Sequence, residues 1–224
     1  AEQKYVTIIG NNSSNDGSVN RPWATLRYAI DHVAQGDTIN LGVGTYNEQK
    51  ILINKSITII GVSAKYSIIQ ADETKPSSGL IGNVVFDIQA NVNINGVTIR
   101  HGSPGINIGS AGKLDIADCN VLDCYTETSG AGIYSAGDIR MENCCVAFNT
   151  CHNSGAGIYA SYTIENPARV AINNSTISHN QCIGNNSMGG GLFLSFASLD
   201  MKNSTVSYNS ALSKGKGIHL NSRN

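Results

Sequence analysis

Four ungapped segments decide the fold of this chain: KLDIADCNVLDC (residues 113–124), DIRMENCCVAFN (138–149), RVAINNSTISHN (169–180) and SLDMKNSTVSYN (198–209). They begin 25, 31 and 29 residues apart, and NVNINGVTIRHG (91–102) is a looser fifth copy. Each of the four is followed by a second short element of the Gly-Ile-Tyr type. A period of this length, with two or three short strands in each repeat, is typical of a β-solenoid.

Alternation within the segments predicts which side chains point into the solenoid, because successive side chains of a strand face opposite ways. The predicted interior columns are Leu114, Ile139, Val170 and Leu199; Ile116, Met141, Ile172 and Met201; Cys119, Cys144, Ser175 and Ser204; and Val121, Val146, Ile177 and Val206.

Two further columns are polar and coincide with the bends of each repeat. They are Asp118, Asn143, Asn174 and Asn203, and then Asn149, Asn180 and Asn209. Stacked amide side chains can hydrogen bond from coil to coil, and Asn tolerates left-handed backbone angles. We therefore interpret both columns as asparagine ladders with a structural role.

One stretch has helical rather than strand periodicity. In WATLRYAIDHVA (residues 23–34) the apolar residues fall on one helix face, with Pro22 before them and Gly36 after them. This pattern predicts an N-terminal capping helix over about residues 22–34 that precedes all the coils. The coils are then expected over about residues 37–224.

Composition supports a single domain, residues 1–224, and limits its partners. The chain has 15 basic and 16 acidic residues, which leaves no basic footprint for nucleic acid. No apolar run is long enough to span a membrane. The start at Ala1 would suit the mature side of a cleaved signal peptide, so we expect a secreted or cell-surface protein.

Two parts of the sequence resemble known families. Gly-Ala-Gly-Ile-Tyr or Gly-Gly-Gly-Leu-Phe, followed by Asn-Ser-Thr-(Ile/Val)-Ser-x-Asn, resembles the repeat of polymorphic outer-membrane proteins over roughly residues 105–220. The segments 21–26 (RPWATL), 36–39 (GDTI) and 44–46 (GTY) resemble the N-terminal part of pectate-lyase-like proteins. The resemblance implies an all-β fold: a single-stranded right-handed parallel β-helix of about seven coils with an N-terminal α-helical cap.

The same resemblance implies two functional classes, polysaccharide-degrading enzymes and non-catalytic surface proteins. A lyase needs a cation or calcium to neutralise a uronate carboxylate and a base to remove a proton. The candidate catalytic residues for that alternative are Arg100, His101, Asp123 and Arg140. Among these, His101 and Asp123 occupy one alignment column, and Lys113 is a further charged residue expected near them.

A glycoside hydrolase is less compatible with the sequence than a lyase. Asp115 and Asp200 share an outward column but are expected roughly 14 Å apart, too far for a carboxylate pair. Asp115 and Arg140 should be neighbours, and we expect them to form an exposed ion pair of little consequence.

A row of flat side chains is the best indication of binding. Tyr134, Tyr159, Phe193 and His219 follow Asn107 in one outward column of the second strand. Sugar rings stack on aromatic surfaces, so the row predicts a carbohydrate-binding face. The alternative is that the stacked rings only stabilise the solenoid.

The six cysteines predict stacked pairs, Cys119 with Cys144 and Cys151 with Cys182, which we expect to be mostly free and buried. No spacing of cysteines or histidines resembles a metal site, so no metal or cofactor is expected, except calcium under the lyase alternative.

The sequence thus favours a non-catalytic protein that binds a polysaccharide, a cell-surface glycan or another surface partner. A lyase acting on an acidic polysaccharide is the alternative. The final strand, near Gly217 and Ile218, has no closing cap, which suggests either a homo-oligomer joined at this open coil or a fragment.

Overall fold

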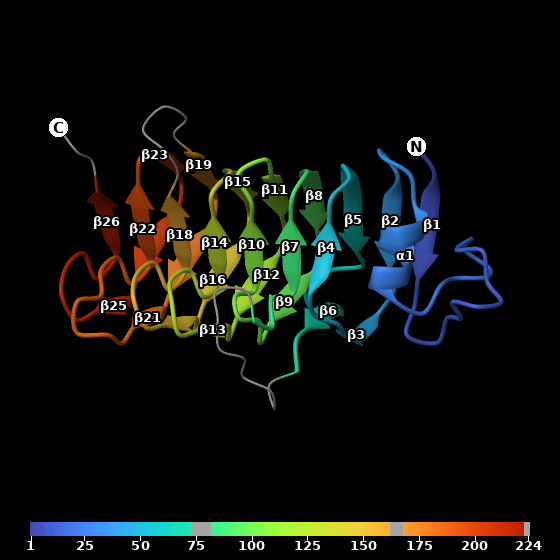
Figure 1. The fold of residues 1–224 in the computed structure, drawn as a ribbon, viewed down its shortest axis with the longest axis horizontal. Helices are drawn as coiled ribbons and strands as arrows, with labels where there is room; N and C mark the ends of the chain where they lie inside the picture. The colour runs from blue at the N-terminus through green and yellow to red at the C-terminus, as the bar shows by residue number, and fades with distance from the viewer. Residues whose placement is uncertain (73–81, 162–167, 222–224) are drawn as a thin grey trace.

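The computed structural model describes residues 1–72, 82–161 and 168–221 of the chain. In these residues the strands form four parallel sheets that run along the long axis of the molecule (Figure 1). The chain advances from the N-terminal end to the C-terminal end, and each strand pairs with strands of the preceding and following coils. The predicted all-β parallel β-helix is confirmed.

The sheets are named here by size or by their first strand. The eight-stranded sheet contains β1 (Gln3–Val6), β2 (Thr38–Leu41), β5 (Ile57–Gly61), β8 (Asn91–Asn95), β11 (Lys113–Ala117), β15 (Asp138–Glu142), β19 (Ala168–Asn173) and β23 (Ala197–Lys202). The β4 sheet contains β4 (Ile51–Ile53), β7 (Phe86–Ile88), β10 (Ile106–Ile108), β14 (Ile133–Ser135), β18 (Ile158–Ser161), β22 (Leu192–Ser195) and β26 (Ile218–Asn221). The β3 sheet contains β3 (Gly44–Asn47), β6 (Ser67–Gln70), β9 (Thr98–Arg100), β12 (Asn120–Leu122), β16 (Cys145–Ala147), β20 (Thr176–Ser178) and β24 (Thr205–Ser207). A four-stranded sheet contains β13 (Tyr125–Thr126), β17 (Thr150–Cys151), β21 (Gln181–Cys182) and β25 (Ser210–Ala211).

The predicted interior columns form the core. Leu114 pairs with Ile139, which pairs with Val170, and each of these side chains is at most 2 % exposed. The same register continues to Leu199 in β23, which is only partly buried because no further coil covers it among the described residues. The alternation of the sequence therefore predicted both the inward face and the coil-to-coil register.

The two asparagine columns behave differently. Asn149, Asn180 and Asn209 are buried; the side-chain amide of Asn149 donates to Asn180 Oδ1 at 2.9 Å, and that of Asn180 donates to Asn209 Oδ1 at 3.0 Å. In the other column, Asn143 donates to Asp118 at 3.3 Å, whereas Asn174 donates to Glu142 instead of its column neighbour. Its members have positive φ angles near +50°, so this column mainly provides left-handed bends.

The N-terminal helix is shorter than predicted. Helix α1 spans Leu26–His32, because the Thr25 side chain accepts the Tyr28 N–H at its start and extended Val33 ends it. Trp23 lies outside the helix and packs over Gly17. The indole leaves no room for a Cβ at Gly17, whose φ is also positive, at +76°. The helix also does not precede every strand, because β1 comes first and pairs with β2.

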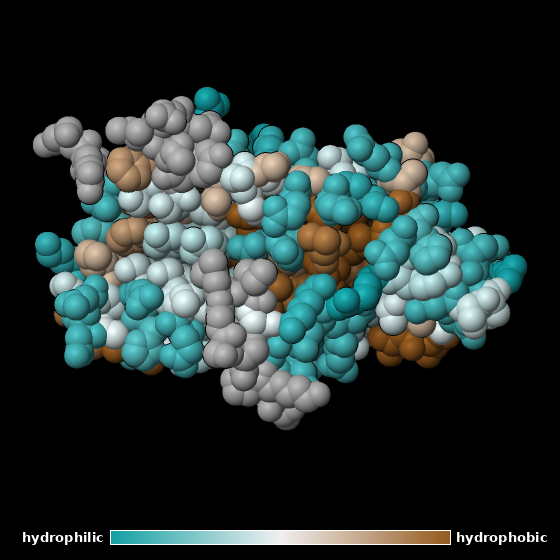
Figure 2. Space-filling model, in the orientation of Figure 1, coloured by the Kyte–Doolittle hydropathy of each residue, from teal (hydrophilic) through white to brown (hydrophobic). Residues whose placement is uncertain are grey.

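The face of the molecule that carries the β4 sheet is largely polar (Figure 2). Figure 2 shows hydrophilic residues over much of the face that carries the β4 sheet, with a hydrophobic area beside β4. Leu52, at the centre of β4, is 50 % exposed. The helix found among the described residues is too short to cross a membrane.

Candidate functional site

A polar hollow lies at the ends of three neighbouring strands of the β3 sheet. Strands β3, β6 and β9 end in Asn47, Gln70 and Arg100, which are aligned across the coils by the parallel register. The residues that follow these strands complete a groove of about 660 Å³. The lining residues are Asn47, Gln49, Gln70, Ala71, Asp72, Arg100 and His101.

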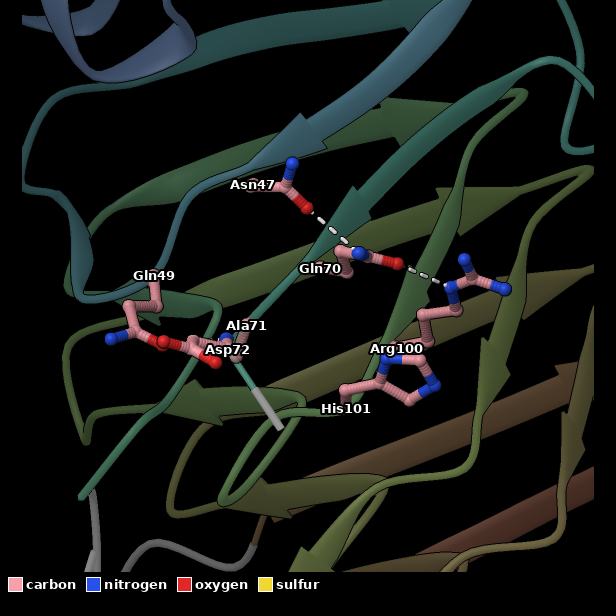
Figure 3. A pocket seen from close by; sticks show the side chains of 7 residues that line it. All are labelled: Asn47, Gln49, Gln70, Ala71, Asp72, Arg100 and His101. Carbon is pink, nitrogen blue, oxygen red and sulfur yellow. Dashed lines mark hydrogen bonds between the residues drawn. The ribbon is translucent and has the colours of Figure 1, made fainter. Parts of the chain in front are cut away.

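The three strand-end side chains are hydrogen bonded in sequence, as Figure 3 shows. The Gln70 side-chain NH₂ donates to Asn47 Oδ1 at 2.7 Å, and Arg100 Nε donates to Gln70 Oε1 at 2.7 Å. Nearby, the Gln49 side-chain carbonyl accepts the Asp72 backbone N–H at 2.9 Å. The groove therefore has an ordered polar wall built from one column of the solenoid.

This wall offers the groups that recognise hydroxyl-rich and anionic ligands. Side-chain amides both donate and accept hydrogen bonds, whereas a guanidinium only donates and matches the geometry of a carboxylate. His101 adds an imidazole at the edge of the groove, at a turn where its φ is +59°. Binding of a polar chain is thus within the chemistry of these residues.

The structure separates the candidate catalytic residues. Arg100 and His101 line the groove, and the register of Arg100 with Leu122 places Asp123 at the same turn one coil further on. Arg140 lies in β15, on the outer side of a different sheet. Lys113 lies in β11 of that same sheet, so it does not join the groove.

Arg140 and Asp115 line a smaller hollow of about 260 Å³ on the eight-stranded sheet. Their strands pair in the predicted register, but the expected ion pair is wrong: Asp115 forms its salt bridge with Lys113, at 3.8 Å. Lys113 and Asp115 are two residues apart on one strand and share its outer face. Both side chains are substantially exposed, so this contact contributes little stability.

The aromatic row of the β4 sheet is a continuous stack. Tyr134 and Tyr159, and Tyr159 and Phe193, have ring centroids 5.1 Å apart, and His219 follows Phe193 at 5.3 Å. The interplanar angles are between 2° and 14°, so each inner ring is covered on both faces by its neighbours. Phe193 is 6 % exposed, whereas Tyr134 and Tyr159 are partly exposed. Because the neighbouring rings cover the faces, mainly the ring edges remain for a ligand.

A second stack lies at the turn after the β3 sheet. Phe148 and His179, and His179 and Tyr208, have ring centroids 5.0 Å apart and are stacked. Phe148 is 56 % and Tyr208 is 81 % exposed. These rings lie in the same turn column as His101 and Asp123 but in later coils.

The cysteines are unpaired and mostly buried. Burial raises the pKa of Cys119 and Cys124 to about 12 and that of Cys144 to about 11. The sulfur atoms of Cys151 and Cys182 lie 3.2 Å apart, and their hydrogen bond together with burial raises the pKa of Cys151. The same hydrogen bond lowers the pKa of Cys182, whereas the thiols with a raised pKa are poor nucleophiles at neutral pH. In the part of the chain that the structure describes, no group of three or more His, Cys, Asp or Glu side chains is arranged to hold a metal ion.

Sequence reasoning found Arg100 and His101 but missed Asn47, Gln49 and Gln70. These three belong to the first coils, where the repeat is too irregular to align with the four well-matched segments. Their alignment depends on the register of β3 with β6 and of β6 with β9. Asn47, Gln70 and Arg100 each end a short strand, but this shared position is recognisable only once the strands and their register are known.

Known proteins share this architecture. Pectin methylesterase PemA from Erwinia chrysanthemi superposes with a TM-score of 0.52 at 15 % identity, covering 96 % of this chain and 68 % of that one. A pectin methylesterase from Aspergillus niger gives 0.55 at 16 % identity, with coverage of 98 % and 80 %. Pectate lyase Pel9A gives 0.53 at 18 % identity, with coverage of 80 % and 54 %. At these identities the similarity shows the fold alone, as predicted from the N-terminal segment.

No curated protein matches the sequence. The predicted resemblance to polymorphic outer-membrane proteins stays a prediction. The family model of the right-handed β-helix region matches residues 78–224, about two thirds of the chain. Together with the four parallel sheets, this match shows that the chain belongs to the family of proteins with a right-handed β-helix region.

Proposed function

We propose that the chain is a secreted or surface-displayed protein that binds carbohydrate in the groove of the β3 sheet without catalysis. The observation that carries this proposal is the hydrogen-bonded row of Asn47, Gln70 and Arg100 along the groove wall. Neighbouring strands are about 4.8 Å apart, so the row offers polar groups at a regular spacing over roughly 10 Å. A regular row of this kind suits a ligand that itself repeats.

The solved neighbours guide the choice of ligands. One pectin methylesterase mutant with this fold, at a TM-score of 0.57 and 14 % identity, was solved in complex with a hexasaccharide. Oligosaccharides of pectic and neutral type are therefore the first ligands to test.

The test is binding to a panel of acidic and neutral oligosaccharides by isothermal titration calorimetry. Replacing Arg100 with Ala removes the charged end of the row, and binding should weaken at least 10-fold. Arg169→Ala is the matched control, because Arg169 is an exposed arginine on the outer side of β19. Equal binding by Arg100→Ala and the wild type, or no binding to any oligosaccharide, would contradict the proposal.

The alternative function is a polysaccharide lyase, which is favoured over a glycoside hydrolase. Arg100 and His101 line the same groove, and an arginine beside a base is the pair that such an elimination needs. Calcium would take part only under this alternative. Incubation with acidic polysaccharides, with and without calcium, should give no ultraviolet absorbance of an unsaturated sugar; a rise would overturn the non-catalytic proposal.

The aromatic row of the β4 sheet is a second proposed contact surface, because Tyr134, Tyr159 and His219 are partly exposed. If these edges and hydroxyls contact a glycan, Tyr159→Ala should reduce binding while the groove remains intact. If the row only stabilises the solenoid, the same change should lower the melting temperature and leave the dissociation constant unchanged.

We further propose that a second copy of the chain pairs at the open C-terminal coil. Strands β23, β24, β25 and β26 each have one neighbour in the described part of the chain. Unpaired edges of this kind are templates for another chain. Light scattering at micromolar concentration should detect a dimer or larger species, and a monomer would contradict this idea.

A further inference from the structure

The hydrogen bonds of Gln70 have only one consistent direction. Arg100 can only donate, so the Gln70 atom that faces it must be the carbonyl oxygen. The Gln70 NH₂ then has to face Asn47, whose carbonyl oxygen accepts from it. The direction of both hydrogen bonds in the row therefore follows from the arginine, which can only donate.

The hydrogen bond from Arg100 Nε to Gln70 determines which edge of the guanidinium can bind a ligand. Nε of Arg100 is used by Gln70, and the hydrogen bonds and salt bridges of the described residues include none from its two Nη atoms. Figure 3 shows those two nitrogens directed away from Gln70. Their N–H groups form the edge that binds a carboxylate through two parallel hydrogen bonds.

No acidic residue is in register with Arg100 in the strand on either side, and the acidic side chain that lines the groove is that of Asp72. The residue in register with Arg100 in the next coil is Leu122, and on the other side it is Gln70. Arg100 is partly buried, which limits the freedom of its aliphatic stem. Because Arg100 is already held at Nε and partly buried, it loses less conformational entropy when a ligand binds than a free surface arginine does.

We propose that Gln70 is a positioning residue that fixes Arg100, and that Arg100 makes the groove selective for a carboxylate-bearing sugar. This inference rests on the carbohydrate binding proposed above and names the ligand chemistry at that site. Asn47 supports the arrangement by holding the NH₂ end of Gln70. The two Nη atoms of Arg100 provide the preference for a carboxylate, and the hydrogen bond from Nε to Gln70 sets the direction in which they point.

The test compares a galacturonate oligosaccharide with its fully methyl-esterified form of equal length, which keeps the shape and removes the charge. The wild type should bind the acid at least 10-fold more tightly than the ester. Gln70→Ala also removes a polar group from the groove wall, so it should weaken binding of both ligands and bring the ratio of their two dissociation constants close to one. Arg100→Lys keeps a positive charge but lacks the fork, and it should also lose most of the preference.

Gln181→Ala is the matched control, because Gln181 is an exposed glutamine in β21, outside the groove. Thermal unfolding of each variant separates a local effect from loss of the fold, and the preference ratio is a readout that stability alone does not move. Equal binding of acid and ester by the wild type, or an unchanged ratio in Gln70→Ala, overturns the inference and leaves the carbohydrate proposal standing. Absence of binding to both ligands overturns the two together.

Discussion

Asn180 offers the sharpest test of what stabilises the coils. Its side chain is fully buried and makes four hydrogen bonds to three residues of the adjacent coils. It accepts from the backbone N–H and the side-chain amide of Asn149, at 3.1 and 2.9 Å, and donates to the backbone carbonyl of Val146 and to Asn209 Oδ1, at 2.9 and 3.0 Å. Replacing Asn180 with Ala removes all four and leaves their partners buried.

Each lost bond costs about 1 kcal/mol net, so we expect the free energy of unfolding to fall by about 4 kcal/mol. This is a large share of the roughly 5–15 kcal/mol that stabilises a typical domain. Urea unfolding followed by far-ultraviolet circular dichroism measures the change. The φ of Asn180 is not positive, so the alanine introduces no backbone strain of its own.

The control is Asn173→Ala, in β19 of the same coil. Asn173 is partly exposed, and its side chain makes no hydrogen bond to the described residues. Its replacement should change stability by no more than about 0.5 kcal/mol. If Asn180→Ala costs as little as Asn173→Ala, the buried amide column does not stabilise the solenoid and the reasoning fails.

Three further outcomes are expected. The Cys124 thiol, whose pKa burial raises to about 12, should react with a disulfide reagent at pH 8 only after denaturation; fast labelling of the native protein would contradict its burial. Two backbone N–H groups lower the pKa of Asp37, so its stabilising effect is complete above its ordinary value of 3.8 and is lost as the pH falls through its lower folded pKa. Asp37→Asn should therefore destabilise the protein more at pH 7 than at pH 2 in urea titrations, and an equal loss at both would be inconsistent with that shift. Phe193→Ala should lower the free energy of unfolding by about 3 kcal/mol, whereas Tyr208→Ala, at an 81 % exposed ring, should cost far less; similar losses would show that stacking outweighs burial.

The coil register was predictable because the interior imposes a strict period of two. A shift of one residue would expose Leu114 and bury Asp115, so the aligned segments allow one pairing only. The start of the helix was harder to predict. Trp23 has the spacing of a helical residue, yet it is buried against Gly17 by the preceding loop, and apolar spacing cannot distinguish these two reasons for burial.

The candidate site was only half predictable for a related reason. Interior residues are constrained by packing, which repeats in every coil, whereas the outward residues of a column are free to differ. Arg100 was therefore found as an isolated charge, and its partners Gln70 and Asn47 emerged only when the register of the irregular first coils was known. In a solenoid, any outward column places residues from successive coils about 4.8 Å apart, so a few substitutions in one column are enough to create a polar row. The groove is the best candidate site because its row is not required by the fold. Asn180 must hydrogen bond to keep the coils together, whereas the exposed Asn47 and the partly exposed Gln70 and Arg100 could be replaced by other strand-end side chains without opening the core.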